Sequence, residues 1–189
     1  LDYLLITHPD KDHYGGCQDV LERFDVANII YTGAKKENNQ SWDSFLTAKT
    51  AEGATYHQIE KEDVWHIAST TLHFLYPDHS VEKSTIIPGL QKDTGPNNSS
   101  IVFILSYHGH TVLMTADTEK ELEEYLLKVY SDQLDVDVLK VGHHGSPGSS
   151  IQEFVDAVTP LHAIISSGAE NSYGHPSQRV IKRLERASS

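Results

Sequence analysis

Short apolar segments alternate with helical segments along the whole chain, and no other feature constrains the fold as strongly. Strands are expected over residues 1–7, 27–31, 100–107, 111–115, 136–141 and 161–166, and helices over residues 17–24, 41–51, 119–130, 151–158 and 178–186. Residues 55–76 alternate polar and apolar side chains with the period of two that is typical of strands. Mostly apolar strands separated by helices predict a layered α/β fold.

Single residues and short stretches allow more detailed predictions. Ser41 and Thr118 are expected to cap the helices that follow them, and Phe24 is expected to share one helical face with Val20 and Leu21. Residues 78–98 hold prolines and glycines with little periodicity, so we expect a long loop of a kind that is often functional. The chain begins with Leu1 inside an apolar strand, and we therefore expect it to be a piece of a longer protein.

Length and composition exclude several classes of protein. The 189 residues suit one domain. A lone Cys17 excludes a disulfide framework and a cysteine-rich zinc site, and its helical position favours packing. The 27 acidic and 15 basic residues give a net charge of −12, which argues against a basic surface that binds nucleic acid tightly. No apolar run approaches the ~18 residues that a membrane span requires.

Potential metal ligands are concentrated directly after the first expected strand. His8, Asp10, Asp12 and His13 occupy six consecutive positions, and imidazole and carboxylate groups are ligands of Zn²⁺, Mn²⁺ and Fe²⁺. Four ligands in one loop favour a pair of ions, with the first two residues at one ion and the last two at the other. Two divalent ions ~3.5–4 Å apart suit phosphodiester cleavage or other hydrolysis. The alternative is a polar loop that caps the next helix.

Further candidates follow later strands, whose carboxyl ends are where α/β sheets build their sites. Asp117 suits a carboxylate that bridges two ions, or an acid at a helix start. Of the adjacent His143 and His144, we expect His144 to bind metal and His143 to act as acid, base or substrate-orienting group. His175 is a ligand, a proton donor or a surface turn residue. Seven other histidines do not belong to any such cluster of potential ligands and are expected to be ordinary strand, turn or surface residues: His57, His66, His73, His79, His108, His110 and His162.

These motifs resemble the metallo-β-lactamase superfamily. The loop over residues 8–13 reads HPDKDH and is similar to the HxHxDH hallmark, with Asp10 where a second histidine usually stands. Together with NNSSI over residues 97–101, LKVGHHGS over residues 139–146 and NSYGHPS over residues 171–177, it resembles the hydrolase domain of ComEC-type DNA-internalisation proteins of natural competence. The resemblance runs through residues 1–189 and implies one hydrolase domain.

The resemblance implies an αββα sandwich with a dinuclear site at one edge. By position, it assigns His8 and Asp10 to the first ion, Asp12 and His13 to the second, and Asp117 to both. The His-His pair and His175 would complete the second ion and its proton chemistry, so that His144 is a ligand while Asp12, His143 and His175 are the catalytic candidates.

Two departures from the family pattern bear on these expectations. Many relatives supply a third histidine about twenty residues before the bridging acid, where this chain has Asn97, Asn98 and Ser99. Either the first ion is weakly held, or Asn98 takes the place of that histidine. Family members also usually begin with a strand pair before the position of Leu1, so N-terminal strands of one sheet are expected to be missing from this chain.

The resemblance and the ligands together favour a metal-dependent hydrolase with two divalent ions, Zn²⁺ or Mn²⁺. DNA during uptake is the expected substrate, a membrane channel domain is the expected partner, and the chain would be a soluble domain of that membrane protein. One alternative is a hydrolase of a small phosphodiester, phosphorylcholine ester, thioester or lactam, because one fold hosts many chemistries. The other is a degenerate module that binds a partner without catalysis.

Overall fold

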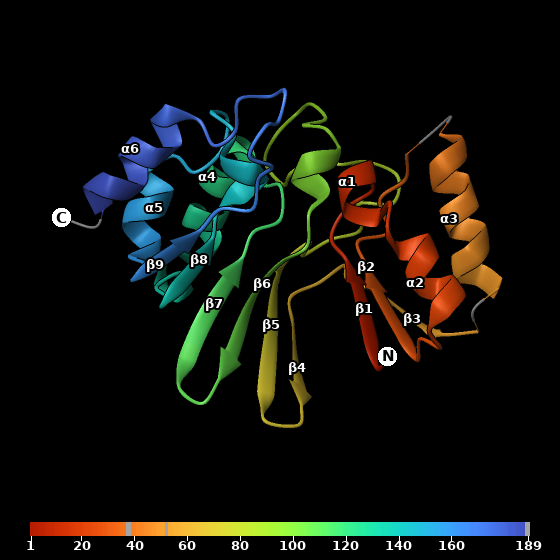
Figure 1. Ribbon diagram of the computed structural model, residues 1–189. Coiled ribbons are helices and arrows are strands. Elements are labelled where there is room, and N and C mark those ends of the chain that lie inside the picture. The colour runs from red at the N-terminus through yellow and green to blue at the C-terminus, as the bar shows by residue number, and fades with distance from the viewer. Residues whose placement is uncertain (37–38, 52, 188–189) are drawn as a thin grey trace.

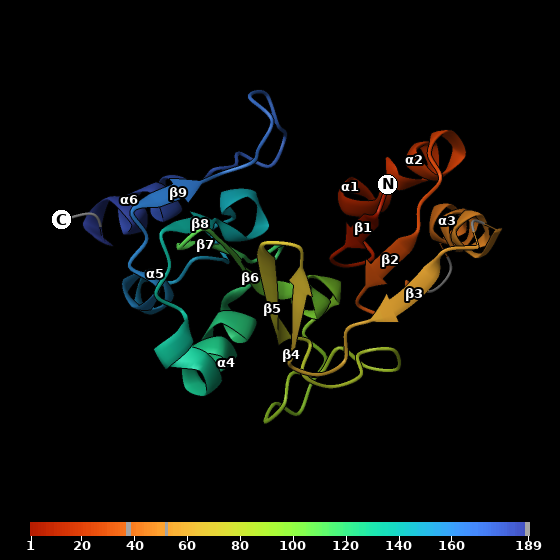
Figure 2. The same cartoon turned by 90° about the horizontal axis from the view of Figure 1, so that it is seen from below.

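Two β-sheets stacked face to face, with helices on both outer sides, make up the fold (Figure 1). The computed structural model describes residues 1–36, 39–51 and 53–187. Within them, every helix is too short or too polar to cross a bilayer. The α/β class and the αββα layering expected from the sequence are confirmed, and Figure 2 shows the same layers from below.

The first sheet is parallel and built from the N-terminal third of the chain. Its strands, in spatial order, are β1 (Tyr3–Ile6), β2 (Asn28–Tyr31) and β3 (Thr55–Gln58). The outer side carries the short helix α1 (Lys11–Tyr14) together with α2 (Cys17–Arg23) and α3 (Gln40–Ala51). The connections after β1 and β2 carry the chain back to the end at which the preceding strand began, so the three parallel strands all end at the same edge of the sheet.

The second sheet has six strands whose spatial order follows the sequence order. They are β4 (Asp63–Ile67), β5 (Thr70–Tyr76), β6 (Val102–Tyr107), β7 (His110–Met114), β8 (Val138–Lys140) and β9 (His162–Ile164). Strands β4 to β7 are antiparallel neighbours, whereas β7, β8 and β9 run parallel. Helices α4 (Lys120–Tyr130), α5 (Gln152–Val158) and α6 (Gln178–Ala187) accompany this sheet. The expected strand pattern over residues 55–76 therefore divides between the two sheets.

Alternating side chains of each strand fill separate layers of the core. Ile29 of β2 packs with Trp42 and Phe45 of α3, whereas the next residue, Ile30, faces the second sheet. There it belongs to a cluster that includes Phe74 and Phe103, whose rings lie 5.6 Å apart. A third cluster joins the strands of the second sheet to α4, α5 and α6. Because successive residues of a strand point to opposite faces, the pair Ile29 and Ile30 packs against a different layer on each side of the sheet.

Three local predictions are wrong, and each has a physical reason. Helix α3 begins one residue before Ser41, and the Asn39 side chain accepts the hydrogen bond from the backbone N–H of Trp42. Thr118 does not cap α4, because other segments supply the acceptors for the first N–H groups of that helix. Phe24 is 53% exposed, since the chain turns to an extended conformation there and leaves the helical face.

Candidate metal centre

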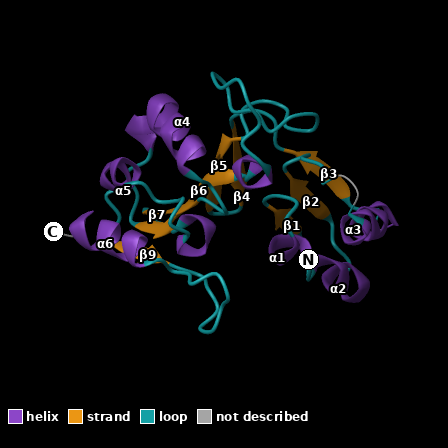
Figure 3. Cartoon of the chain, turned by 90° about the horizontal axis from the view of Figure 1, so that it is seen from above, coloured by secondary structure: helices purple, strands orange, loops and turns teal. Residues whose placement is uncertain are grey.

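The candidate residues lie in loops that follow β1 of the first sheet and β7, β8 and β9 of the second sheet. Figure 3 shows the two sheets and their connecting loops from above. His8 follows β1, Asp117 follows β7, and the His143–His144 pair follows β8. A backbone hydrogen bond of 3.0 Å from the N–H of Ile101 to the carbonyl of Thr7 ties the two sheets together at this point. The loops that follow these separate strands thus meet at one edge of the sandwich.

The first loop contains a turn of helix that the sequence did not indicate. Helix α1 begins after Asp10, whose carbonyl accepts hydrogen bonds from the N–H groups of His13 and Tyr14. Gly15 ends this turn so closely that a Cβ there would lie 2.4 Å from the carbonyl oxygen of Lys11. The turn allows Asp12 and His13 to point in the same direction as His8, although the three are close neighbours in sequence.

Four side chains from three loops present ligand atoms that all lie within 4.8 Å of one another: Asp12, His13, Asp117 and His144. The Nε2 atom of His13 lies 3.2 Å from Oδ1 of Asp117. The Nε2 atom of His144 lies 3.1 Å from Oδ2 of Asp12 and 3.5 Å from Oδ2 of Asp117. Two imidazoles and two carboxylates at such distances form a donor set suited to a transition-metal ion or Zn²⁺.

A second, looser group shares Asp117. The Nε2 atom of His8 lies 3.8 Å from Oδ2 of Asp117 and 3.9 Å from Oδ2 of Asp10. The rings of His8 and His13 lie 4.1 Å apart, so the two groups adjoin. The other oxygen of Asp10 accepts a hydrogen bond of 2.5 Å from Nζ of Lys36. Asp117 therefore faces both groups, with Oδ1 toward His13 and Oδ2 toward His8 and His144.

Three buried polar atoms of the centre have no hydrogen-bond partner, and they test whether the residues fit metal ions. They are Nε2 of His8, Nε2 of His13 and Oδ1 of Asp117. His8 is 0% and Asp117 is 2% exposed. Leaving buried polar groups without a partner is costly unless an ion or another group binds there. The orphaned atoms all belong to potential ligands and converge on one place, so the residues fit divalent ions.

Hydrogen bonds behind the rings hold two histidines with Nε2 toward the centre. The Nδ1 atom of His144 donates to the carbonyl of Ser166 over 2.7 Å. The Nδ1 atom of His8 lies 3.1 Å from the hydroxyl of Thr7 and 3.3 Å from that of Ser100. The carbonyl at Nδ1 of His144 fixes the tautomer that leaves Nε2 free as a ligand, as is usual for histidines at metal sites, whereas the hydroxyls at Nδ1 of His8 orient that ring.

The charges of the centre shift its pKa values strongly. Burial, and then the neighbouring His13, lower the pKa of His8 to about 4, so this ring is neutral at pH 7. Burial by itself would raise the pKa of Asp117, but the His13 ring, whose Nε2 lies 3.2 Å from Oδ1, and the charges of His8 and His144 hold it at about 2. Asp117 is thus an ionised carboxylate beside a neutral imidazole, which are the protonation states that metal binding needs.

His143 differs from its neighbour in what it contacts. Both residues adopt left-handed backbone angles, with φ of 45° and 54°, which are uncommon for residues with a side chain. The Nδ1 atom of His143 lies 3.2 Å from the Glu119 carboxylate, and Nε2 lies 3.9 Å from Oδ2 of Asp117. The hydrogen bond to Glu119 raises the pKa of His143 and lowers that of Glu119. His143 therefore lies at the centre but is paired with an acid of its own.

His175 lies beside the centre rather than among its closest donors. Its ring is 5.9 Å from that of His143, and its buried Nδ1 has no hydrogen-bond partner. A cavity of about 640 Å³ opens onto His175 and is lined by Asp10, Lys11, Asp12, Asp117, His143, His144 and Tyr173. Burial, followed by the charges of His143 and His144, lowers the pKa of His175. Six of the eight residues predicted from the sequence thus line one cavity, and the other two, His8 and His13, lie beside Asp117.

Asn98 is engaged by the scaffold. Its side chain is fully buried, its Oδ1 accepts a hydrogen bond of 3.0 Å from the N–H of Glu119, and its Nδ2 faces the carbonyl of Thr94 at 3.4 Å. Asn97 donates to the Glu119 carboxylate over 3.1 Å. Both asparagines therefore position the start of α4 and the partner of His143.

Sequence reasoning missed two residues of the centre. Lys36 is 26 positions from Asp10, in a loop after β2, and no motif connects the two. From the sequence alone, Glu119 is interpreted as an acid that suits the dipole at the start of a helix. Its position two residues after Asp117 is the signal in the sequence that could have placed it near the centre. The seven histidines set aside in the sequence lie outside the four-residue ligand group, which is the one such group among the described residues.

A buried glutamate supports the loop behind His143. Glu123 of α4 is 0% exposed, and its carboxylate accepts hydrogen bonds from the N–H groups of Ser150 and Ile151 at 2.6 and 2.8 Å. Burial raises the pKa of Glu123 to about 7, against the opposing effect of these two hydrogen bonds and of Arg183. This carboxyl therefore makes the stability of the fold depend on pH.

Glu123→Gln is expected to remove that dependence. Because the folded state binds the proton of Glu123 more tightly than the unfolded state, its stabilisation is complete below pH 4.5 and is lost as the pH rises to about 7. Gln cannot release a proton, but its Nε2 also cannot accept the second backbone hydrogen bond, so the variant should be less stable than the wild type at low pH. The difference in the free energy of unfolding should then shift in favour of the variant by up to about 3 kcal/mol as the pH rises from 4.5 to above 7. Urea unfolding across this range, with Glu124→Gln as the exposed control, measures the difference. A difference that stays constant with pH contradicts the prediction.

Comparisons with known proteins point to the same family as the motifs in the sequence. Residues 1–169 match the family model described as Metallo-beta-lactamase superfamily. The ComE operon protein 3 of Bacillus subtilis (strain 168) is 34% identical over 188 residues, which are 100% of this chain and 23% of that protein. Competence protein ComA of Neisseria gonorrhoeae is 32% identical over 185 residues, which are 97% of this chain and 22% of that protein. The resemblance to ComEC-type competence proteins is thereby confirmed.

The relatives are much longer than this chain, which spans less than a quarter of their length. Among solved structures, the metallo-beta-lactamase fold protein YhfI from Bacillus subtilis has a TM-score of 0.55 and 13% identity, and the match covers 100% of this chain and 72% of that chain. At this identity the likeness shows the fold alone. It agrees with the two stacked sheets described above.

Proposed function

This chain belongs to the metallo-beta-lactamase superfamily, and on that basis we propose that it is a two-metal phosphodiesterase that cleaves DNA. Members of the superfamily are usually metal-dependent hydrolases and often bind two divalent ions. The observation that carries the proposal is the position of Asp117, a buried carboxylate that faces one histidine with Oδ1 and three others with Oδ2. A shared carboxylate between two ligand groups is what a pair of neighbouring ions requires.

The ligand groups assign residues to each ion. His8, Asp10 and Asp117 would hold the first ion, and Asp12, His13, Asp117 and His144 would hold the second, with Zn²⁺ or Mn²⁺ as the ions. The second group is the tighter, since its donor atoms all lie within 4.8 Å of one another. In the first group, Lys36 shares Asp10 and offsets part of its charge. We therefore infer that the second ion binds more tightly than the first.

The residues around the ions would orient the phosphate and move protons. When bound, two such ions neutralise the charge of a phosphodiester and activate water for attack. His143 is held by Glu119 with its other nitrogen toward Asp117, a position from which it can donate a proton to the leaving oxygen. His175 lines the same cavity and is the second candidate for proton transfer. Asp12 would act here as a ligand beside His144, since its Oδ2 lies 3.1 Å from Nε2 of that ring.

DNA as the substrate is supported by the relatives, which are competence proteins. The net charge of −12 opposes DNA binding by bulk electrostatics. Two divalent ions would offset part of this charge locally, and Lys11 lines the cavity. We further propose that residues 1–189 form the hydrolase domain of a longer membrane protein, whose channel domain delivers the strand. Delivery by a neighbouring domain would remove the need for tight binding by this one.

A substrate panel tests the proposed function. Protein reconstituted with Mn²⁺ or Zn²⁺ is assayed on single-stranded DNA, duplex DNA, a small phosphodiester, a phosphorylcholine ester, a thioester and a lactam. The proposal predicts metal-dependent cleavage of DNA that Asp12→Ala abolishes. Preference for one of the small substrates would favour the alternative hydrolase. A metal-loaded protein that cleaves none of them, with Asp12→Ala indistinguishable from the wild type, would make the chain a non-catalytic module.

A further inference from the structure

A second cavity adjoins the metal centre on the side of the loop after β9. Its volume is about 330 Å³, within the range of about 300–1,000 Å³ that is typical of small-ligand pockets. Four of its lining residues also line the cavity of the metal centre: Asp12, His144, Tyr173 and His175. The remaining lining comes from the loop over residues 166–171. A substrate whose phosphate lies at the ions can therefore extend directly into this second cavity.

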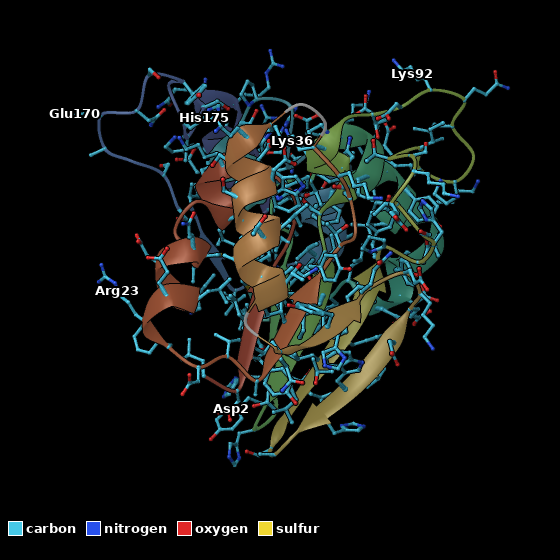
Figure 4. All side chains as sticks on the ribbon, turned by 90° about the vertical axis from the view of Figure 1, so that its right-hand side faces the viewer. Asp2, Arg23, Lys36, Lys92, Glu170 and His175 are labelled. Carbon is cyan, nitrogen blue, oxygen red and sulfur yellow. The ribbon has the colours of Figure 1, made fainter. Side chains whose placement is uncertain are left out.

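Tyr173 stands at the boundary of the two cavities with its ring open to solvent. Its exposed fraction is 81%, and its ring stacks on that of His175 at 5.8 Å with an angle of 18° between the planes. Figure 4 shows the loop that carries Glu170 projecting from the body, with His175 at its base. A large aromatic ring exposed to this degree contributes little to the core, so packing does not account for its position.

The loop holds Tyr173 in place although the ring itself is exposed. Oδ1 of Asn171 accepts hydrogen bonds from the N–H groups of Tyr173 and His175 at 3.1 and 2.9 Å. Its Nδ2 donates to the carbonyls of Gly168 and His175 at 2.7 and 2.5 Å. The N–H of Ser177 also donates to the carbonyl of Gly145 over 2.8 Å, which ties the loop to the His143–His144 segment. The ring is therefore presented at a set position beside the centre.

We propose that Tyr173 stacks on a nucleobase of single-stranded DNA next to the phosphate at the metal centre, with the second cavity receiving that nucleotide. The proposal rests on the proposed function and names the form of DNA that the site accepts. An aromatic face beside a phosphate site matches a nucleotide, because every base offers a π-face for stacking. In a duplex the bases are already stacked and paired, so a fixed ring cannot reach them without unstacking. Single strands are therefore the favoured substrate.

The proposal predicts that Tyr173 and the bases are energetically coupled. Base–aromatic stacking is worth about 1–3 kcal/mol per base, which corresponds to about 5- to 150-fold in affinity. The wild-type protein with Mn²⁺ should therefore bind a short oligothymidylate at least about fivefold more tightly than an abasic strand of equal length. Tyr173→Ala should lose this preference, whereas Tyr173→Phe should keep it. Tyr107→Ala removes an exposed tyrosine at the distant β6–β7 turn and should leave it unchanged.

Fluorescence anisotropy with phosphorothioate-linked strands measures these affinities without requiring cleavage, and a gel verifies that the strands stay intact. Loss of the base preference in Tyr173→Ala, with its return in Tyr173→Phe, supports the proposal. Equal preference in the wild type and Tyr173→Ala overturns it, and so does a wild type without any base preference. If the coupling is found but unmodified strands are not cleaved, the proposed function fails and this inference stands. If unmodified strands are cleaved but the base preference does not depend on Tyr173, the proposed function stands and this inference fails.

Discussion

Asp117→Asn is expected to lower the rate of phosphodiester cleavage by at least about a thousandfold, the equivalent of about 4 kcal/mol in transition-state stabilisation. The amide keeps the size of the side chain, so the buried position can still be filled. It removes the negative charge that His8, His13 and His144 surround, and it places an N–H₂ group where a ligand oxygen is needed. Both ligand groups lose a member, because Asp117 belongs to each.

Initial rates with saturating Mn²⁺ measure this effect. Asp43→Asn makes the same chemical change at an exposed position of α3 and should retain wild-type rates. Far-UV circular dichroism of both variants establishes that they are folded. A folded Asp117→Asn protein whose rate lies within about tenfold of the wild type would show that this carboxylate is not shared by the ions.

His143→Gly is expected to reduce kcat by about a hundredfold or more while leaving KM nearly unchanged, because general acid catalysis contributes about 10²–10⁴-fold. Glycine suits this position, since the backbone there has a φ of 45° and glycine adopts such angles without strain. The substitution also leaves space for a small molecule. Added imidazole should therefore restore part of the rate if the ring acts in proton transfer.

Two further variants separate catalysis by His143 from a structural role. Glu119→Gln removes the charge that pairs with Nδ1 of His143 and should lower kcat by a smaller factor than His143→Gly does. His108→Ala removes an exposed histidine at the β6–β7 turn and should have no effect. A His143→Gly protein with wild-type kcat, or one that loses metal and does not respond to imidazole, contradicts the assigned role and makes His175 the stronger candidate.

The layered fold and most residues of the centre could be predicted because their signals are local. His8, Asp10, Asp12 and His13 lie within six positions of one another, and so many ligand types in one loop favour metal binding over helix capping, which uses a single polar side chain. Asp117 and the His143–His144 pair could be found because each follows an apolar strand. Carboxyl ends of parallel strands meet at one edge, so position along the chain was sufficient to bring them together.

What the sequence could not show depends on contacts between distant segments. Thr118 has the composition of a helix cap, but the N–H of Glu119 donates to Asn98 and that of Lys120 donates to the carbonyl of Gly148. These tertiary acceptors leave the hydroxyl of Thr118 buried and without a role as a cap. Lys36 reaches Asp10 from a loop in the same way. Propensity describes a helix by itself, whereas its ends are completed by whichever segment lies nearby.

Metal content measured by native mass spectrometry tests the two-ion centre most directly. After reconstitution with Mn²⁺ or Zn²⁺, the wild type is expected to carry two ions per chain. His8→Ala should carry one, because it removes a residue of the looser group and leaves the tighter group of Asp12, His13, Asp117 and His144 intact. One ion per chain or fewer in the folded wild type would contradict the two-ion centre, since a two-ion hydrolase needs both ions.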